Sequence, residues 1–230
     1  MRWWLLVTLC ACRIGFDEHP HAGADAPIDS MTGDATITTI TFGERPTSQR
    51  KGVTIDATVS QPMPSFNFGG AEDLSLAEFA SAAEHGLLRF DVSSIAAGTA
   101  VIGARLALTR LDYGDETVGP MQLRLLDESW VPGTATGMPG PGVTWQTRDG
   151  TRAWITAGGT TSRTLTTMTP TAAELVMTFD PAAVQAWVDD PTTNVGLLVT
   201  VGASTAHFHL HTSNSVLAAA RPELTLDIAQ

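Results

Sequence analysis

Cysteine, lysine and tyrosine are the scarce residues of this 230-residue chain. The two cysteines are Cys10 and Cys12, so the long remainder can form no disulfide and offers no thiol nucleophile. Lys51 is the one lysine, and 13 basic residues stand against 24 acidic ones, which gives a net charge of -11. A phosphate-rich polyanion would meet repulsion on average, so we expect no nucleic-acid partner.

Catalytic sequence motifs are absent as well. The chain contains no G-x-S-x-G, no H-E-x-x-H and no phosphate-binding P-loop. Acidic residues stand next to each other at Asp127-Glu128 and at Asp189-Asp190, among other places. Adjacent residues on a strand or loop edge point apart, so these pairs indicate turns rather than an acid–base pair. We therefore expect a protein that is not an enzyme.

The chain is instead rich in short alternating hydrophobic segments. Residues 86–92 and 101–110 alternate apolar with polar side chains around a turn that contains serine and glycine, which is typical of a β-hairpin. The same pattern predicts strands at 36–42, 53–59, 121–127, 174–179, 195–201, 206–212 and 223–228. One helix is expected at 182–188, with Asp180 as its N-cap and Pro181 in its first turn. These elements predict an all-β fold, an antiparallel β-sandwich with one short helix.

The first twelve residues are typical of a bacterial export signal. Arg2 precedes the apolar run 3–9, which is far shorter than the roughly 20 residues that span a bilayer. The following Leu9-Cys10-Ala11-Cys12 resembles a lipoprotein box, in which the thiol of Cys12 receives a lipid; ordinary secretory cleavage is the alternative. Residues 13–36 are expected to form a flexible tether, and residues 37–230 the folded domain.

Short motifs along residues 37–230 occur in the order seen in one known family. They are Asp56-Ala57-Thr58-Val59, Asn67-Phe68-Gly69-Gly70, Leu87-Leu88-Arg89-Phe90-Asp91, Trp130-Val131-Pro132-Gly133, Gly142-Val143-Thr144-Trp145, Phe179-Asp180, Val184-Gln185-Ala186-Trp187, Asn194-Val195-Gly196-Leu197-Leu198 and Arg221-Pro222-Glu223-Leu224. Together they resemble the disaggregatase-related (DNRLRE) domain, whose close relatives are carbohydrate-binding modules for alginate and related glycans. The resemblance implies a jelly-roll-like β-sandwich on a secreted or surface protein, without a catalytic role. The chain departs from this family at Ser213-Asn214, where an acidic residue is usual.

The longest region without an expected strand is 128–164, and it concentrates aromatic and cationic side chains. It contains Trp130, Trp145 and Trp154, together with Arg148 and Arg152. Sugars stack their C–H faces on aromatic rings, and their hydroxyls or carboxylates accept hydrogen bonds from arginine. These five residues are the candidate ligand-binding site. The alternative is that the tryptophans close one end of the sandwich as core residues.

A second cluster consists of three histidines on one expected strand. Residues two apart on a strand share a face, so His207, His209 and His211 should project together while Phe208 and Leu210 enter the core. Two such imidazoles can bind one zinc or copper ion, and the spacing suits two ligands better than three. The alternative is a polar outer face of the sheet.

Asp56 and Asn67 form a third, smaller candidate site. Their oxygens could join around a structural calcium, since calcium prefers hard oxygen ligands from loops. Side-chain capping of a sharp loop at Asn67-Phe68-Gly69-Gly70 is the alternative.

These observations together predict a non-catalytic lipoprotein of the bacterial cell surface. We expect it to be secreted, lipid-anchored through Cys12 to the cell envelope at the outer membrane, and to bind an extracellular or cell-envelope polysaccharide, with uronate-containing polysaccharides among the candidates. One alternative is a structural envelope or adhesion protein that makes protein–protein contacts. Another is a surface protein that binds zinc or copper through the histidine strand.

Overall fold

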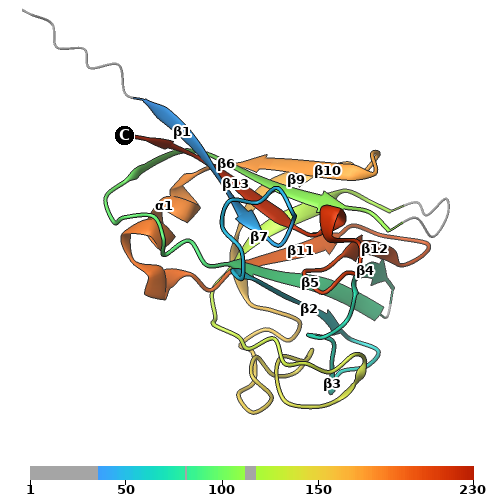
Figure 1. The fold of residues 1–230 in the computed structure, drawn as a ribbon. Helices are drawn as coiled ribbons and strands as arrows, with labels where there is room; N and C mark the ends of the chain where they lie inside the picture. Colours follow the sequence, from blue (N-terminus) through green and yellow to red (C-terminus); the bar gives the residue numbers. More distant parts are fainter. Residues whose placement is uncertain (1–35, 81, 112–117) are drawn as a thin grey trace, which may run out of the picture. The chain divides into compact units, whose positions relative to one another are not determined.

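The computed structural model describes residues 36–80, 82–111 and 118–230 (Figure 1). These residues belong to one compact unit. The expected signal, the lipidation residue Cys12 and the expected tether up to residue 35 lie outside the described residues.

Two antiparallel sheets make up the fold. The first has the strand order β1 (Ile37–Gly43), β13 (Glu223–Ala229), β6 (Ala100–Thr109) and β10 (Glu174–Phe179). The second has the order β12 (Phe208–His211), β4 (Asp73–Phe79), β5 (Ala82–Phe90), β11 (Leu197–Val201), β7 (Met121–Leu126) and β9 (Thr161–Met168), with β2 (Thr54–Ser60) also paired to β5. The short strands β3 (Phe66–Asn67) and β8 (Met138–Pro139) pair with each other. The prediction of an antiparallel all-β sandwich is confirmed; β3, β4, β8 and β9 are strands that the sequence pattern did not predict.

The expected helix is also present, as α1 (Ala182–Asp189). Asp180 accepts a hydrogen bond from the backbone N–H of Ala182 at 3.0 Å, so its side chain serves the start of the helix although Pro181 occupies the N-cap position. The helix buries Val184, Trp187 and Val188 on one face. Two 3-10 turns, η1 (Pro191–Thr193) and η2 (Ala218–Ala220), complete the helical content of the described residues. No helix in this part of the chain combines the length and apolar character needed to cross a membrane.

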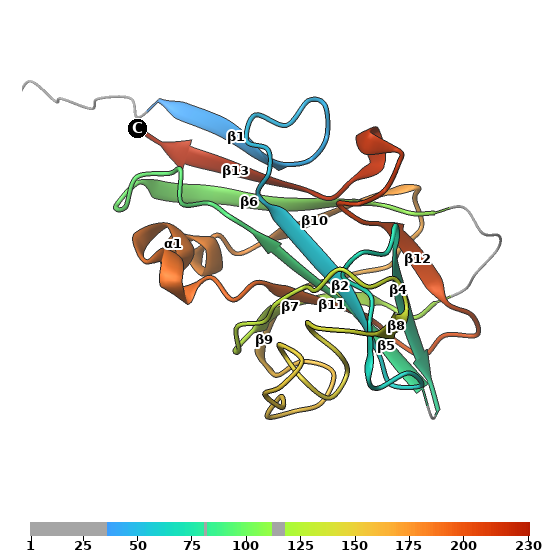
Figure 2. The ribbon, with the colours of Figure 1, turned by 60° about the horizontal axis from the view of Figure 1, so that its bottom comes forward.

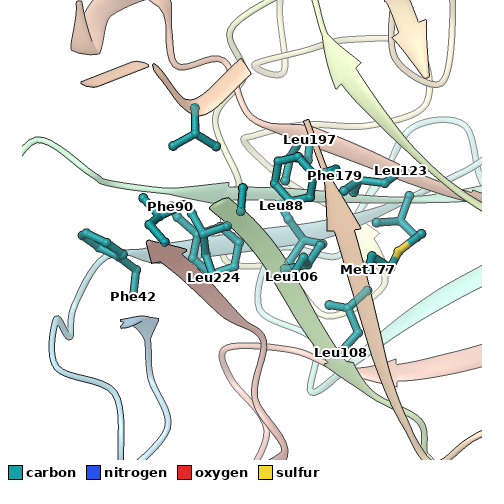
Figure 3. Close-up of a cluster of buried hydrophobic side chains, with 14 of the residues drawn as sticks. Phe42, Leu88, Phe90, Leu106, Leu108, Leu123, Met177, Phe179, Leu197 and Leu224 are labelled. Carbon is teal, nitrogen blue, oxygen red and sulfur yellow. The ribbon is translucent and has the colours of Figure 1, made fainter. Parts of the chain in front are cut away.

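The main hydrophobic core lies between the two sheets (Figure 3). One sheet contributes Leu106 and Leu224, and the other contributes Leu88, Phe90 and Leu197, all of them fully buried. Alternation along each strand sends every second side chain into this layer, which is why the period-two pattern identified the strands.

A second hydrophobic cluster lies on the opposite face of the larger sheet. It consists of Ala57, Val59, Leu87, Leu126, Trp130, Val143, Trp154 and Leu198. Neighbouring residues of one strand therefore enter different clusters, Leu88 the main core and Leu87 the second one. The irregular segment that follows β7, drawn in yellow to gold, covers this face below β2, β5 and β11 (Figure 2). The central strands of the larger sheet are thus buried on both faces.

Candidate functional site

A groove of about 350 Å³ opens beside β4 and β12. We call it the β4–β12 groove. Its walls come from β2, the segment before β3, the β3–β4 loop, β4, β5, the loop before β8 and the start of β12: Thr58, Met63, Phe68, Ala71, Asp73, Ser75, Glu84, Thr136, His207 and His209. The register pairs Phe208 with Leu76 and His209 with Ser75. Because Leu76 and Phe208 are buried in the main core, the alternating residues Ser75 and His209 face the groove.

Two imidazole–carboxylate pairs are the central feature of the groove. His209 donates a hydrogen bond from Nδ1 to Oδ2 of Asp73 over 2.8 Å, and His207 donates from Nδ1 to Oε2 of Glu84 over 2.9 Å. The two imidazole rings lie 6.1 Å apart, centroid to centroid. The hydrogen bond from His209 holds the pKa of Asp73 below its usual value, because it stabilises the carboxylate form.

Glu84 is held in place from several directions. It is buried, and Ser60 donates a hydrogen bond to its Oε1 over 2.7 Å. The hydroxyl of Ser75 donates to Oε2, the atom that also accepts from His207. The backbone N–H of Ser75 in turn donates to the hydroxyl of Thr58 over 2.9 Å. A carboxylate with this many donors is fixed in orientation before any ligand arrives.

Phe68 also lines the groove, and its neighbour Asn67 holds the loop that carries it. The Nδ2 of Asn67 donates to the carbonyls of Pro132 and Val143, at 2.6 and 2.8 Å. Its Oδ1 accepts from the backbone N–H of Ala135 at 3.0 Å. Asn67 is completely buried, so these bonds join the β3 loop to the 132–143 segment without competition from water.

The side chain of Asn67 thus joins the loop segments around it. Both polar atoms of its side chain are already bonded to backbone groups. Asp56 lies buried in β2 and accepts a hydrogen bond from the backbone N–H of Ser213 over 2.6 Å. Ser213-Asn214 is the place where the sequence departs from the family pattern. In the structure, the hydrogen bond from Ser213 connects this segment to Asp56. Within the described ranges, no three His, Cys, Asp or Glu side chains come together as possible metal ligands.

The tryptophans of the 128–164 region lie away from the groove. Trp130 and Trp154 are only 2% and 6% exposed, and their indole N–H groups donate to the carbonyls of Val195 and Thr144, both at 3.0 Å. Trp145 is half-buried, with its ring 4.9 Å from that of His85. This arrangement corresponds to the alternative in which the tryptophans are core residues, since Trp130 and Trp154 present no open ring face to a sugar.

The two candidate arginines are placed differently from each other. Arg148 lies near Glu128, with 3.7 Å between Nε and Oε1, and donates to the backbone carbonyl of Ser129. Arg152 pairs with Asp149 at 2.8 Å, but its side chain remains 71% exposed. Arg152 is therefore the candidate of this loop that is most accessible to a ligand, without an aromatic partner identified beside it.

The histidine strand divides into a pair and a single residue. His207 and His209 both line the groove, whereas His211 is buried and its Nδ1 is hydrogen-bonded to the hydroxyl of Ser215 over 2.8 Å. Burial lowers the pKa of His211, because it disfavours the charged imidazole. His207 and His209 therefore share the groove and His211 lies outside its lining, while the zinc or copper site expected on this strand stays a prediction.

Sequence reasoning missed Phe68, Asp73, Ser75 and Glu84 as site residues. Asp73 and Ser75 alternate with Leu74 and Leu76, and this short pattern in the sequence could have identified them as one face of a strand. Nothing local connects them with His209, which lies 136 residues further along the chain.

Comparison with known proteins adds no assignment: no protein-family model matches the chain, and no curated protein matches it. Functional inference therefore rests on the chemistry of the groove. The groove offers carboxylate acceptors, imidazoles and the hydroxyls of Thr58 and Ser75, with the ring of Phe68 on one wall. This mixture suits a ligand that has many hydroxyl groups and apolar C–H faces.

Proposed function

We propose that this protein is a non-catalytic carbohydrate-binding β-sandwich of the bacterial cell envelope, and that the β4–β12 groove is its glycan site. The observation that carries the proposal is the pair of oriented imidazole–carboxylate groups beside Phe68 in one groove. Side chains that are already fixed by hydrogen bonds lose little conformational entropy when a sugar hydroxyl binds. The lipoprotein box at Cys12 supports attachment to the envelope.

The proposed glycan contacts therefore lie in the β4–β12 groove and not at the tryptophans of the 128–164 region. Two supports remain from the sequence: the ordered motifs that resemble DNRLRE domains, and the lack of catalytic motifs. The aromatic surface for sugar stacking is supplied by Phe68 instead of by Trp130, Trp145 or Trp154.

Affinity electrophoresis of the full chain in gels containing neutral, uronate-containing or amino-sugar polysaccharides tests the proposal. We expect retardation by at least one of them. Phe68→Ala and His209→Ala should weaken it about tenfold, the effect of losing one good contact. Arg152→Ala, on the exposed part of the 128–164 region, is the matched control and should bind like the wild type.

Two results would contradict the proposal. Absence of binding to every polysaccharide would remove the glycan function and favour the structural or adhesion alternative. In that case, envelope proteins retained by the protein after polysaccharide digestion would identify its partners. Loss of binding in Arg152→Ala but not in Phe68→Ala would place the glycan site in the 128–164 region instead of the groove.

A further inference from the structure

Apart from its two histidines, the ionisable residues of the β4–β12 groove are acidic. Asp73 and Glu84 are its acidic side chains, and no lysine or arginine belongs to its lining. The partners that contact these carboxylates directly are histidines and serines. The chain as a whole carries a net charge of -11, so the surrounding field has the same sign as the groove.

The two carboxylates differ in their access to a ligand. Glu84 is buried and surrounded by donors, so it mainly orients His207 and the two serines. The side chain of Asp73 remains 38% exposed while it accepts from His209. A ligand in the groove can therefore reach Asp73 directly from solvent.

We propose that the groove selects glycans that carry free amino groups, and that it disfavours uronates. This inference rests on the proposed glycan function and names its ligand class. A protonated sugar amine has three N–H donors and a positive charge, which match the exposed carboxylate of Asp73. A uronate would bring a third carboxylate into a groove whose lining contains no lysine or arginine, and like charges in a partly buried site repel.

N-acetylated sugars are the informative comparison. Acetylation keeps the ring, the hydroxyls and the stacking face, but it removes the positive charge and most of the N–H donors of the amine. A preference for the free amine over the acetamide thus isolates the contact with Asp73 from the remainder of sugar recognition. The carboxylate of Asp73 is ionised at neutral and mildly acidic pH, because its usual pKa of 3.8 is already low and the hydrogen bond from His209 lowers it further.

The experiment is isothermal titration of the full chain at about pH 6, where the amines of glucosamine oligomers are largely protonated and Asp73 is ionised. The ligands are glucosamine oligomers with free amines, the same oligomers N-acetylated, and uronate oligomers of equal length. We expect the free-amine oligomers to bind about tenfold more tightly than either of the others. This advantage should shrink as salt is raised from about 0.05 to about 0.5 M, because salt screens charge pairs.

Asp73→Asn is the deciding variant, since the amide keeps the size of the side chain and an acceptor for His209. It should remove the preference for the free amine while its melting temperature stays near that of the wild type. Glu72→Gln makes the same change in net charge at the neighbouring exposed residue outside the groove lining, and should keep the preference.

Each of the other possible outcomes contradicts either the selectivity for free amines or the glycan function itself. Equal binding of free-amine and acetylated oligomers, or tighter binding of uronates, contradicts the selectivity and leaves the glycan function intact. An equal loss in Glu72→Gln and Asp73→Asn shows general charge attraction and also contradicts it. Failure of all three ligands, together with no retardation in any polysaccharide gel, removes the proposed function itself.

Discussion

Replacement of Asp56 by asparagine should change how the stability of the protein depends on pH. Asp56 lies in β2, is 2% exposed, and accepts a hydrogen bond from the backbone N–H of Ser213. Burial raises the pKa of Asp56 from its usual 3.8 to about 6, because the charged form loses its hydration; the hydrogen bonds from Ser213 oppose this rise.

The sign of the effect follows from proton binding. Between about pH 4 and about pH 6 the folded protein keeps a proton on Asp56 that the unfolded chain releases, so the free energy of unfolding falls as pH rises. A difference of one pKa unit corresponds to about 1.4 kcal/mol. A rise from 3.8 to about 6 therefore makes the folded protein about 3 kcal/mol less stable above pH 6 than below pH 4.

Asparagine has nearly the same shape, carries no charge at any pH, and retains an oxygen that can accept from Ser213. Asp56→Asn should thus match the wild type at about pH 4 and exceed it by up to about 3 kcal/mol at about pH 8. Urea denaturation of both proteins across this range measures the difference, in which all other titrating groups cancel. The reasoning is refuted if the two stability curves run parallel.

Asp91→Asn is the control variant, because the pKa shift of Asp91 is opposite in direction to that of Asp56. Asp91 is exposed, and hydrogen bonds from Ser93 hold its pKa below the usual value. Its contribution to stability is therefore present above the pKa of the unfolded chain and is lost as pH falls. As pH rises, the free energy of unfolding of the wild type should increase relative to that of Asp91→Asn. Relative to that of Asp56→Asn, it should decrease.

Two further predictions concern the hydrogen bonds that Asn67 makes with the neighbouring loop and the effect of removing metal ions. Asn67→Ala should lower the free energy of unfolding by about 3 kcal/mol in urea denaturation, because it leaves the buried carbonyl of Val143 without its donor. The control is Asn214→Ala, which removes a single hydrogen bond to Gly69 at an exposed site. It should lower the free energy of unfolding by less than about 1 kcal/mol. Glycan retardation should be unaffected by EDTA; loss on chelation that zinc restores would instead make His207 and His209 metal ligands.

The sequence pattern predicted most of the strands that have one or both faces buried. β6 alternates between the main core and solvent, and Leu197 with Leu198 in β11 fills both hydrophobic clusters. β9 was missed because none of its side chains is fully buried and its apolar residues are few, so its sequence shows no period-two alternation of apolar and polar residues. β4 was missed because its alternation is short and follows a loop.

The site could not be predicted to the same extent, because it depends on register between distant strands. The pairing of β12 with β4 sets His209 opposite Ser75 and beside Asp73. A shift of one residue would have placed the other face of β12 in the groove. His211 belongs to the same strand face by sequence, but the turn after β12 brings Ser215 to it and closes it off.

The buried tryptophans contribute to the groove only through the loop that they hold. Trp130 packs in the same cluster as Val143, and the carbonyl of Val143 accepts from Asn67. The next residue, Phe68, forms a wall of the groove. A tryptophan variant should therefore weaken the proposed glycan binding whether its ring stacks on the sugar or only supports the loop. Phe68→Ala separates the two roles, because it removes a groove surface and leaves the tryptophan cluster unchanged.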